Sequence, residues 1–182
     1  MQRQFTATVY IIDHDQVLLI YHRKHKKWLP PGGHLGKDEL PSEAAIREAK
    51  EETGLDIELI LDEHCWVKSW NASSFPRPYL CLLEEIPAFG EQPQHQHVDM
   101  IYLAKSVGGL EQENAQETDG LRWFTIEEIE VLASDIDIFE ETKQVIRNIL
   151  ANQTVASFFE RSELTTRLTD KTEVDSLYEP RK

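Results

Sequence analysis

Short apolar runs alternate with polar breaks along most of the chain, and most of these runs have the length of a β-strand. Residues 5–12 and 17–21 are apolar and rich in β-branched side chains, and the polar residues 13–16 between them predict a hairpin turn. Further strand-like stretches are separated by polar or proline-containing connections. They cover residues 57–67, 79–86, 98–104 and 121–124. With helices between some of these strands, we expect a mixed β-sheet.

Residues 41–53 form the clearest predicted helix. They begin with a proline and are followed by Gly54, and both are typical of helix ends. Ile46, Ala49 and Thr53 lie on one side of this helix, which is expected to face the core.

Two further helices are predicted later in the chain. Thr125 is expected to cap a short helix that runs through Leu132. Residues 136–150 place apolar side chains at helical spacing, which predicts an amphipathic helix on the sheet. In contrast, residues 22–36 contain two prolines and three glycines and are predicted to form a loop.

The composition fits one globular domain with a short appendage. Of 182 residues, 40% are hydrophobic and 29% are charged, so a core can form within a polar surface. We assign residues 1–150 to the domain. Residues 151–182 are polar and charged, and they are expected to be a C-terminal extension that is helical or disordered.

The charge and the apolar runs restrict the partners. A net charge of -14 disfavours binding to duplex nucleic acid. No apolar run approaches the length of a membrane span, and the first residues lack a signal-peptide pattern. The two cysteines lack CxxC spacing, as expected in a reducing cytoplasm. We therefore predict a cytoplasmic protein that binds neither duplex nucleic acid nor membranes, and a homodimer is also compatible with the sequence.

Three carboxylates share one side of the predicted helix. Glu48, Glu51 and Glu52 project into an arc of about 100°. One interpretation is a solvated acidic face, because exposed like charges cost only about 0.2–0.5 kcal/mol per pair. If glycines 32–33 cover this face, each pair at about 4 Å costs roughly 4 kcal/mol, and a cation is needed to offset it. Carboxylate ligands would then favour Mg²⁺ or Mn²⁺.

The 23 residues from Gly33 to Leu55, GHLGKDELPSEAAIREAKEETGL, resemble the signature of the Nudix hydrolases. Every fixed polar and glycine position of that signature is present, and Ala49 stands where a bulky aliphatic residue is usual. The resemblance implies an α/β fold, an α/β/α sandwich around a mixed sheet. It also implies metal-dependent hydrolysis of a diphosphate linkage in a nucleoside diphosphate derivative, with Mg²⁺ or Mn²⁺ as cofactor.

The resemblance further implies roles for single residues. The metal ligands would be Glu48, Glu51 and Glu52, together with a backbone carbonyl of the Gly32-Gly33 loop, and Glu51 and Glu52 would act directly in catalysis. Glu39 and Arg47 would form an ion pair that fixes the loop to the helix.

The general base is less well defined, because its position varies among Nudix enzymes. Glu117 lies six residues before Trp123 and looks like the late acidic residue that many of them bring to the metal site. It would be a ligand or the base. A solvated loop carboxylate is the alternative for Glu117, and Glu111 and Glu113 are competing candidates.

Substrate contacts are predicted from basic and aromatic residues. Arg23 and Lys27 belong to a basic run before the signature and could hold phosphates, or they could face solvent at a hairpin end. Trp70 could stack on a base or ribose and Arg77 could reach phosphate, with surface packing as the alternative for both.

His95, His97 and Asp99 alternate in strand register and are expected to share one face. A second metal site there is one interpretation, and a polar strand end is the more common one.

The substrate is not determined by the sequence. The compact chain and the run WLPPGGH look like small triphosphate-cleaving Nudix members, which favours a (deoxy)nucleoside triphosphate. The alternatives are an ADP-ribose, nucleotide-sugar or dinucleotide pyrophosphatase, an RNA 5′ pyrophosphohydrolase, and a non-catalytic nucleotide-sensing module. Metal-dependent cleavage of small nucleotides would distinguish an enzyme from the sensing module, and retention on RNA at moderate salt would indicate the RNA 5′ pyrophosphohydrolase.

Overall fold

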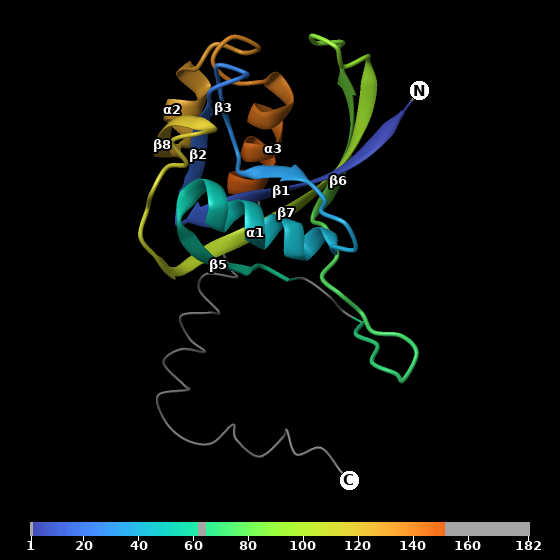
Figure 1. Ribbon diagram of the computed structural model, residues 1–182. Helices are drawn as coiled ribbons and strands as arrows, with labels where there is room; N and C mark the ends of the chain where they lie inside the picture. Colours follow the sequence, from blue (N-terminus) through green and yellow to red (C-terminus); the bar gives the residue numbers. More distant parts are fainter. Residues whose placement is uncertain (1, 62–64, 152–182) are drawn as a thin grey trace, which may run out of the picture.

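The computed structural model of the protein describes residues 2–61 and 65–151. It shows a mixed sheet with α1 on one face and α2 and α3 on the other (Figure 1). This is the α/β/α sandwich that the sequence predicted. The strands are β1 (Arg3–Asp13), β2 (Gln16–His22), β3 (Lys27–Leu29), β4 (Gly32–His34), β5 (Leu55–Leu59), β6 (Leu80–Ile86), β7 (His95–Gly109) and β8 (Thr118–Thr125). The helices are α1 (Pro41–Thr53), α2 (Ile126–Val131) and α3 (Glu140–Ala151).

The long strand β1 organises the sheet. The main order is β3-β2-β1-β7-β5, while β4 pairs with β1, β6 with β7 and β8 with β2. The β1–β7 pair is parallel and the other pairs are antiparallel. The first part of β1 pairs with β4 and its end pairs with β2. Because β1 is long enough to do both, it lies against the loop that precedes α1 and also in the core.

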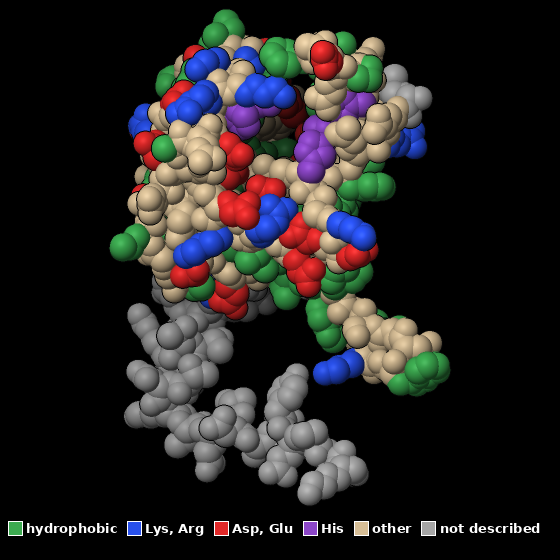
Figure 2. Space-filling view, in the orientation of Figure 1, with side chains coloured by type: hydrophobic (Ala, Val, Ile, Leu, Met, Phe, Trp, Pro, Cys, Tyr) green, Lys and Arg blue, Asp and Glu red, His purple; other side chains and the backbone are tan. Residues whose placement is uncertain are grey.

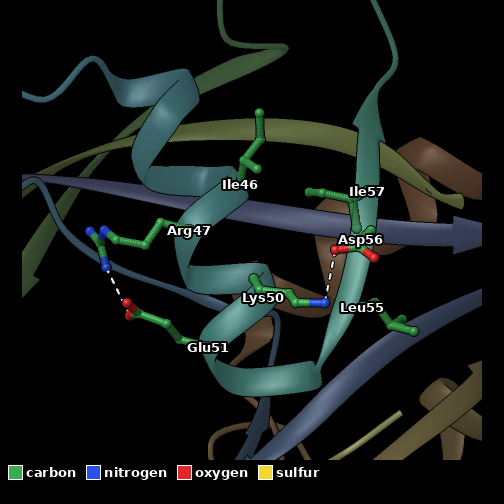
Figure 3. A pocket seen from close by; sticks show the side chains of 7 residues that line it. All are labelled: Ile46, Arg47, Lys50, Glu51, Leu55, Asp56 and Ile57. Atoms are coloured by element: carbon green, nitrogen blue, oxygen red, sulfur yellow. Dashed lines mark hydrogen bonds and ion pairs between the residues drawn. The ribbon is translucent and has the colours of Figure 1, made fainter. Parts of the chain in front are cut away.

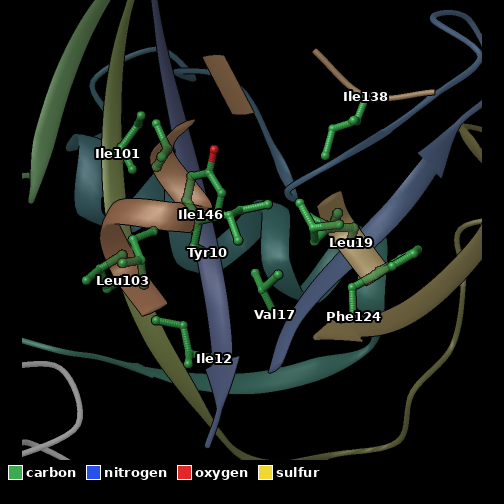
Figure 4. Packing of buried hydrophobic residues seen from close by; sticks show 12 residues of the cluster. Tyr10, Ile12, Val17, Leu19, Ile101, Leu103, Phe124, Ile138 and Ile146 are labelled. Carbon is green, nitrogen blue, oxygen red and sulfur yellow. The ribbon is translucent and has the colours of Figure 1, made fainter. Parts of the chain in front are cut away.

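Side chains alternate between two apolar layers, as expected for a sheet covered on both faces. On one side, Tyr10, Ile12, Ile101 and Leu103 pack against α3, where Ile146 is fully buried (Figure 4). On the other side, small residues of α1 pack against β1 and β7. That second layer includes Ala7, Val9, Ala44, Ala45, Ala49, Tyr102 and Ala104.

Helix α1 has the predicted bounds. Its first residue is a proline, and Gly54 ends it in the left-handed conformation with φ 73°. Ala49 and Thr53 are buried, as expected. The expectation for Ile46 was wrong, because this side chain is 43% exposed. The buried side of α1 instead includes Glu52, so a carboxylate lies on the side of the helix that faces the protein interior.

Several sequence-based boundaries need correction. Residues 22–36 contain the short strands β3 and β4, because Pro30 and Pro31 fall between the two strands and break neither. The strand expected at 57–67 is β5, Leu55–Leu59, and part of the remainder lies outside the described residues. The last helix begins at Glu140 rather than 136.

Three other predictions are confirmed, with bounds that agree to within two residues at each end. They are the first hairpin, the short helix capped by Thr125 and the strand at 79–86. The predicted extension at 151–182 lies outside the described residues after Ala151. In the described part of the chain, no helix is long and apolar enough to cross a membrane.

Candidate active site

Helix α1 and strand β4 bring the three signature carboxylates against the glycine pair. Glu52 is 2% exposed, and its Oε2 accepts a hydrogen bond of 2.9 Å from the amide of Gly32. The side chain of Glu48 is 12% exposed, whereas that of Glu51 is 54% exposed. A Cβ added to Gly33 would lie 2.5 Å from Oε1 of Glu48, so only glycine allows this close approach. The carboxylates are therefore graded from buried to exposed along one side of the helix.

Arg47 connects the preceding loop to this acidic group. Its Nε and Nη2 donate to the two oxygens of Glu39, at 2.8 and 2.9 Å. Its Nη1 also donates to Glu48 at 2.7 Å and to Glu51 at 3.1 Å, and Nη2 reaches the carbonyl of His34 at 3.2 Å. The ion pair expected between Glu39 and Arg47 is thus present. It holds the loop over α1 in a bidentate geometry, which is the strongest kind of carboxylate–guanidinium contact.

The environment perturbs the titration of these groups. Burial raises the pKa of Glu52 to about 8, the Gly32 amide opposes this rise, and the charges of Glu48, Glu117 and Glu51 add to it. Burial also raises the pKa of Glu48, against the contacts with Arg47. The hydrogen bonds from Arg47 lower the pKa of Glu39. Negative charge at Glu48 and Glu52 is consequently only partly compensated by the protein.

These residues fit a divalent cation. Three carboxylates from one helix provide hard oxygen ligands, and their uncompensated charge would be neutralised by Mg²⁺ or Mn²⁺. Within residues 2–61 and 65–151, no three His, Cys, Asp or Glu side chains already surround a common metal position. Arg47 lies between Glu48 and Glu51 instead, and Glu52 faces the Gly32 amide. A cation would therefore compete with Arg47 and Gly32 for the same oxygens.

Comparisons with known proteins agree with this geometry. The model of the NUDIX domain matches residues 2–149. The chain belongs to the Nudix family. A Nudix-family hydrolase from Clostridium perfringens is 30% identical, and its crystal structure superposes with a TM-score of 0.65 over 82% of this chain and 97% of that one. The crystal structure of a MutT NUDIX hydrolase from Burkholderia pseudomallei shares the fold at 18% identity, with a TM-score of 0.57 over 82% of this chain and 99% of that one.

A curated relative also matches. The protein of Lactococcus lactis subsp. cremoris named "Probable DHNTP pyrophosphohydrolase" is 30% identical over 116 residues. The match covers 62% of this chain and 58% of that protein, which is less than two thirds of its length.

Glu117 of this Nudix protein lies in the turn before β8, near the α1 carboxylates. Its charge contributes to the raised pKa values of Glu48 and Glu52. Of the competing candidates, Glu111 accepts a hydrogen bond of 2.7 Å from the Trp123 indole, and the charge of Glu113 acts on Arg23. The geometry therefore favours Glu117 among the three late carboxylates.

The two basic residues predicted to hold phosphate are engaged with the protein. Arg23 pairs with Asp119 at 2.6 Å and donates to the carbonyls of residues 116 and 118, so it holds the turn that contains Glu117. The amine of Lys27 donates to the carbonyls of Asp135 and Ile136 at 2.7 and 3.0 Å. Phosphate binding by either residue stays a prediction, and both have structural roles as they stand.

The structure does not bring Trp70 to the acidic site, and the phosphate contact of Arg77 stays a prediction. The loop around the Lys68–Ser73 bridge, which contains Trp70, projects from the body of the domain (Figure 1). Trp70 is 96% exposed within it. Arg77 instead follows Pro76, whose carbonyl accepts a hydrogen bond of 3.3 Å from the Tyr102 hydroxyl. Sequence reasoning could not detect this projection, because aromatic residues in a loop look alike whether the loop folds back or extends.

A hollow in the domain surface adjoins the acidic site, and sequence reasoning missed it as a site. In the space-filling view it lies between two groups of histidines, with acidic side chains below it (Figure 2). One group is His22 and His25 in the β2–β3 hairpin, and the other is His34, His95 and His97. Lys24 lies 5.1 Å from the Phe89 ring centroid, so the β2–β3 and β6–β7 turns meet beside the hollow.

The predicted shared face of His95, His97 and Asp99 is confirmed by the pairing of β7 with β6, where these residues oppose Ile86, Glu84 and Leu82. The Nε2 atoms of His95 and His97 lie 3.2 Å apart, and Asp99 is hydrogen-bonded to Thr6. These contacts match the polar strand end, and the described residues hold no metal-binding group of three here.

A second, shallow depression lies between α1 and β5, on the side that carries Ile46 (Figure 3). Lys50 spans it to reach Asp56 at 2.8 Å, and Ile57 lines it from β5. Its charged groups are paired with one another, so the hollow beside the carboxylates is the better candidate for a substrate pocket.

Proposed function

We propose that the protein hydrolyses a phosphoanhydride bond of a nucleoside triphosphate or a pterin triphosphate and releases pyrophosphate and the corresponding monophosphate. The observation that carries this proposal is the set of signature carboxylates held by α1 against Gly32 and Gly33. The DHNTP named for the Lactococcus relative, a dihydropterin triphosphate, belongs to this class of substrate. The hollow next to the carboxylates offers room for the organic group.

The residues have separate tasks in this reaction. Glu48, Glu51, Glu52 and the backbone at Gly33 would hold Mg²⁺ or Mn²⁺, which when bound supplies positive charge for the diphosphate oxygens and lowers the pKa of water. Arg47 and Glu39 keep the loop and helix in register. The carboxylate of Glu117 would accept a proton from the attacking water. The water oxygen bonds to phosphorus, and the P–O bond to the leaving pyrophosphate breaks.

The test is product analysis on a substrate panel in the presence of Mg²⁺, Mn²⁺ or EDTA. The panel contains nucleoside triphosphates, dihydroneopterin triphosphate, ADP-ribose, NADH, dinucleoside polyphosphates, nucleotide sugars and 5′-triphosphorylated RNA. We expect metal-dependent release of pyrophosphate from a triphosphate of the first two kinds. Cleavage confined to ADP-ribose, nucleotide sugars or RNA would overturn the triphosphate assignment. Nucleotide binding without cleavage would identify a sensor module.

Replacing Glu117 tests the base. Glu117→Gln is expected to lower kcat by about 10-fold or more while the affinity for Mn²⁺ changes little, because the amide cannot accept the proton. Weakened Mn²⁺ binding would show that Glu117 is a metal ligand instead. Glu113→Gln is the matched control in the same turn, and its turnover should equal that of the wild type. Wild-type turnover in Glu117→Gln would assign the role to another carboxylate.

A further inference from the structure

One face of the sheet changes from apolar to polar at the edge of the α3 layer. Along β1, Tyr10 belongs to the core, and Thr8 and Thr6 follow it on the same side toward the start of the strand. Along β7, Ile101 is in the core and Asp99 and His97 continue the same side. Helix α3 covers the apolar part. The polar part faces the hollow between the histidine groups (Figure 2).

Glu84 projects from β6 onto this polar part. It lies directly opposite His97 in the β6–β7 pairing, while Leu82, two residues earlier on the same face, packs against the core. Its side chain is 31% exposed. Burial raises the pKa of Glu84 to about 7, and the charges of Asp99 and Glu141 add to this rise, so the carboxyl is mostly ionised at pH 8. Glu84 is therefore a half-buried carboxyl at the border between the core and the hollow.

Glu84 makes only a weak contact with His97. Oε2 of Glu84 lies 3.8 Å from Nδ1 of His97, which is beyond hydrogen-bond distance. Burial lowers the pKa of His97 to about 4, with the other histidines adding to the effect, so His97 is neutral at pH 7 and provides no counter-charge. Asp99 differs, because its Oδ1 accepts hydrogen bonds from Thr6 at 2.8 Å and Thr8 at 3.1 Å. Glu84 has the capacity to bind a ligand, whereas Asp99 is held in place.

Strand β4 connects this carboxyl to the acidic site. Gly32 and Gly33 contact Glu52 and Glu48, and the His34 ring lies 5.0 Å from that of His97. Two residues of extended chain span roughly 7 Å. A triphosphate at the α1 carboxylates would thus place its organic group beside His34 and His97, within the hollow that Glu84 borders.

An ionised carboxylate selects for a particular ring edge. Its two oxygens accept hydrogen bonds from two parallel N–H donors, and such paired bonds to a charged group are strong and directional. A 2-amino-4-oxopyrimidine ring, which is part of both guanine and pterin, offers an amino N–H beside a ring N–H. Adenine presents an N–H beside a bare ring nitrogen, and hypoxanthine lacks the amino group. The flat imidazoles of His34 and His97 suit the faces of such rings.

We propose that Glu84 is a specificity-determining residue that accepts the two N–H donors of a 2-amino-4-oxopyrimidine ring bound in the hollow. The inference rests on the proposed function, because the phosphates must lie at α1 for the ring to reach Glu84. It limits the substrates to guanine nucleotides and pterin triphosphates, which share this edge.

The test measures binding without turnover. Titration calorimetry of the full chain with Mg²⁺ at pH 8 compares GMP, IMP and AMP, which contain no phosphoanhydride bond and are not cleaved, and neopterin monophosphate replaces GMP in a second arm. We expect GMP to bind at least about 10-fold more tightly than IMP, because the missing amino group leaves part of the carboxylate unpaired. Glu84→Gln should reduce this ratio to within about 2-fold, since the amide presents a donor where an acceptor is required. The two arms show whether the guanine or the pterin form is preferred.

Glu85→Gln is the matched control. Glu85 is the next residue of β6 on the opposite face, where it accepts a hydrogen bond from Gln96, and the variant should keep the wild-type ratio. Glu84→Asp retains the charge and should keep the preference for GMP. It is the variant to compare with the wild type if Glu84→Gln fails to fold.

Equal binding of GMP and IMP to the wild type would overturn the proposal, as would an unchanged ratio in Glu84→Gln or no binding of GMP and neopterin monophosphate at millimolar concentration. Failure of the proposed function is a separate result. In that case the panel would show no triphosphate cleavage while the GMP to IMP ratio and its dependence on Glu84 remained.

Discussion

Glu52→Gln is expected to lower kcat by at least about 100-fold while the protein stays folded. The carboxylate is buried between α1 and Gly32, and the neutral amide that replaces it would be a weaker ligand for the proposed metal ion. Glu51→Gln should have an effect of similar size on kcat, although that side chain is more exposed. Both variants should also bind Mn²⁺ more weakly in a calorimetric titration. Glu58→Gln on β5, which pairs with Lys105, is the control and should behave like the wild type.

The stability of Glu52→Gln separates a lost ligand from a damaged fold. The pKa of Glu52 is raised to about 8 in the folded protein, above its ordinary value of 4.5, so the folded state is disfavoured increasingly as pH rises from about 5 to 8. Glutamine removes this penalty. In EDTA at pH 8 the variant should therefore be at least as stable to urea as the wild type. Near-normal turnover in both Glu51→Gln and Glu52→Gln would contradict the proposed metal site.

Gly32→Ala is expected to reduce the free energy of unfolding by about 1–3 kcal/mol and to lower activity with it. The new Cβ would lie 2.7 Å from the carbonyl oxygen of Ala7 and 2.8 Å from Cα of Thr8. Both atoms belong to the backbone of β1, so the strand β4 must move. That movement would weaken the hydrogen bond from the Gly32 amide to Glu52.

Urea denaturation and steady-state kinetics measure this effect, with Gly108→Ala as the control. An added Cβ at Gly108 meets its nearest neighbour, Oδ2 of Asp56, at an ordinary 3.5 Å. The control should be neutral or slightly stabilising, because alanine restricts the unfolded chain. Equal stabilities for the two variants would show that β4 has room to spare against β1.

The parts of the fold that depend on local signals could be predicted from the sequence. Pro41 and Gly54 mark the ends of α1, and the turn at residues 13–16 marks the first hairpin. Strand β4 was missed because its glycines argue locally against a strand, whereas the pairing with β1 depends on contacts far away in the chain. Ile46 was misplaced for a related reason, since α1 buries small residues and a carboxylate against the sheet.

The candidate site shows the same division. The carboxylates of α1, Gly33 and the Glu39–Arg47 pair could be predicted because they lie within one continuous motif. Glu84 could not, because its meeting with His97 and Asp99 depends on the register of β6 and β1 with β7. The phosphate contacts, the cytoplasmic location and the homodimer stay predictions.

Strand β4 has three residues and is paired along its whole length with β1, from Thr8↔Gly32 to Thr6↔His34. One of its ends faces the signature carboxylates of α1, and the His34 ring at the other end lies beside the His97 ring. An inserted or deleted residue would flip the glycines to the opposite side of the sheet. The pairing with β1 therefore fixes the distance between the signature carboxylates and the His34–His97 pair, whatever the length of the loops on either side.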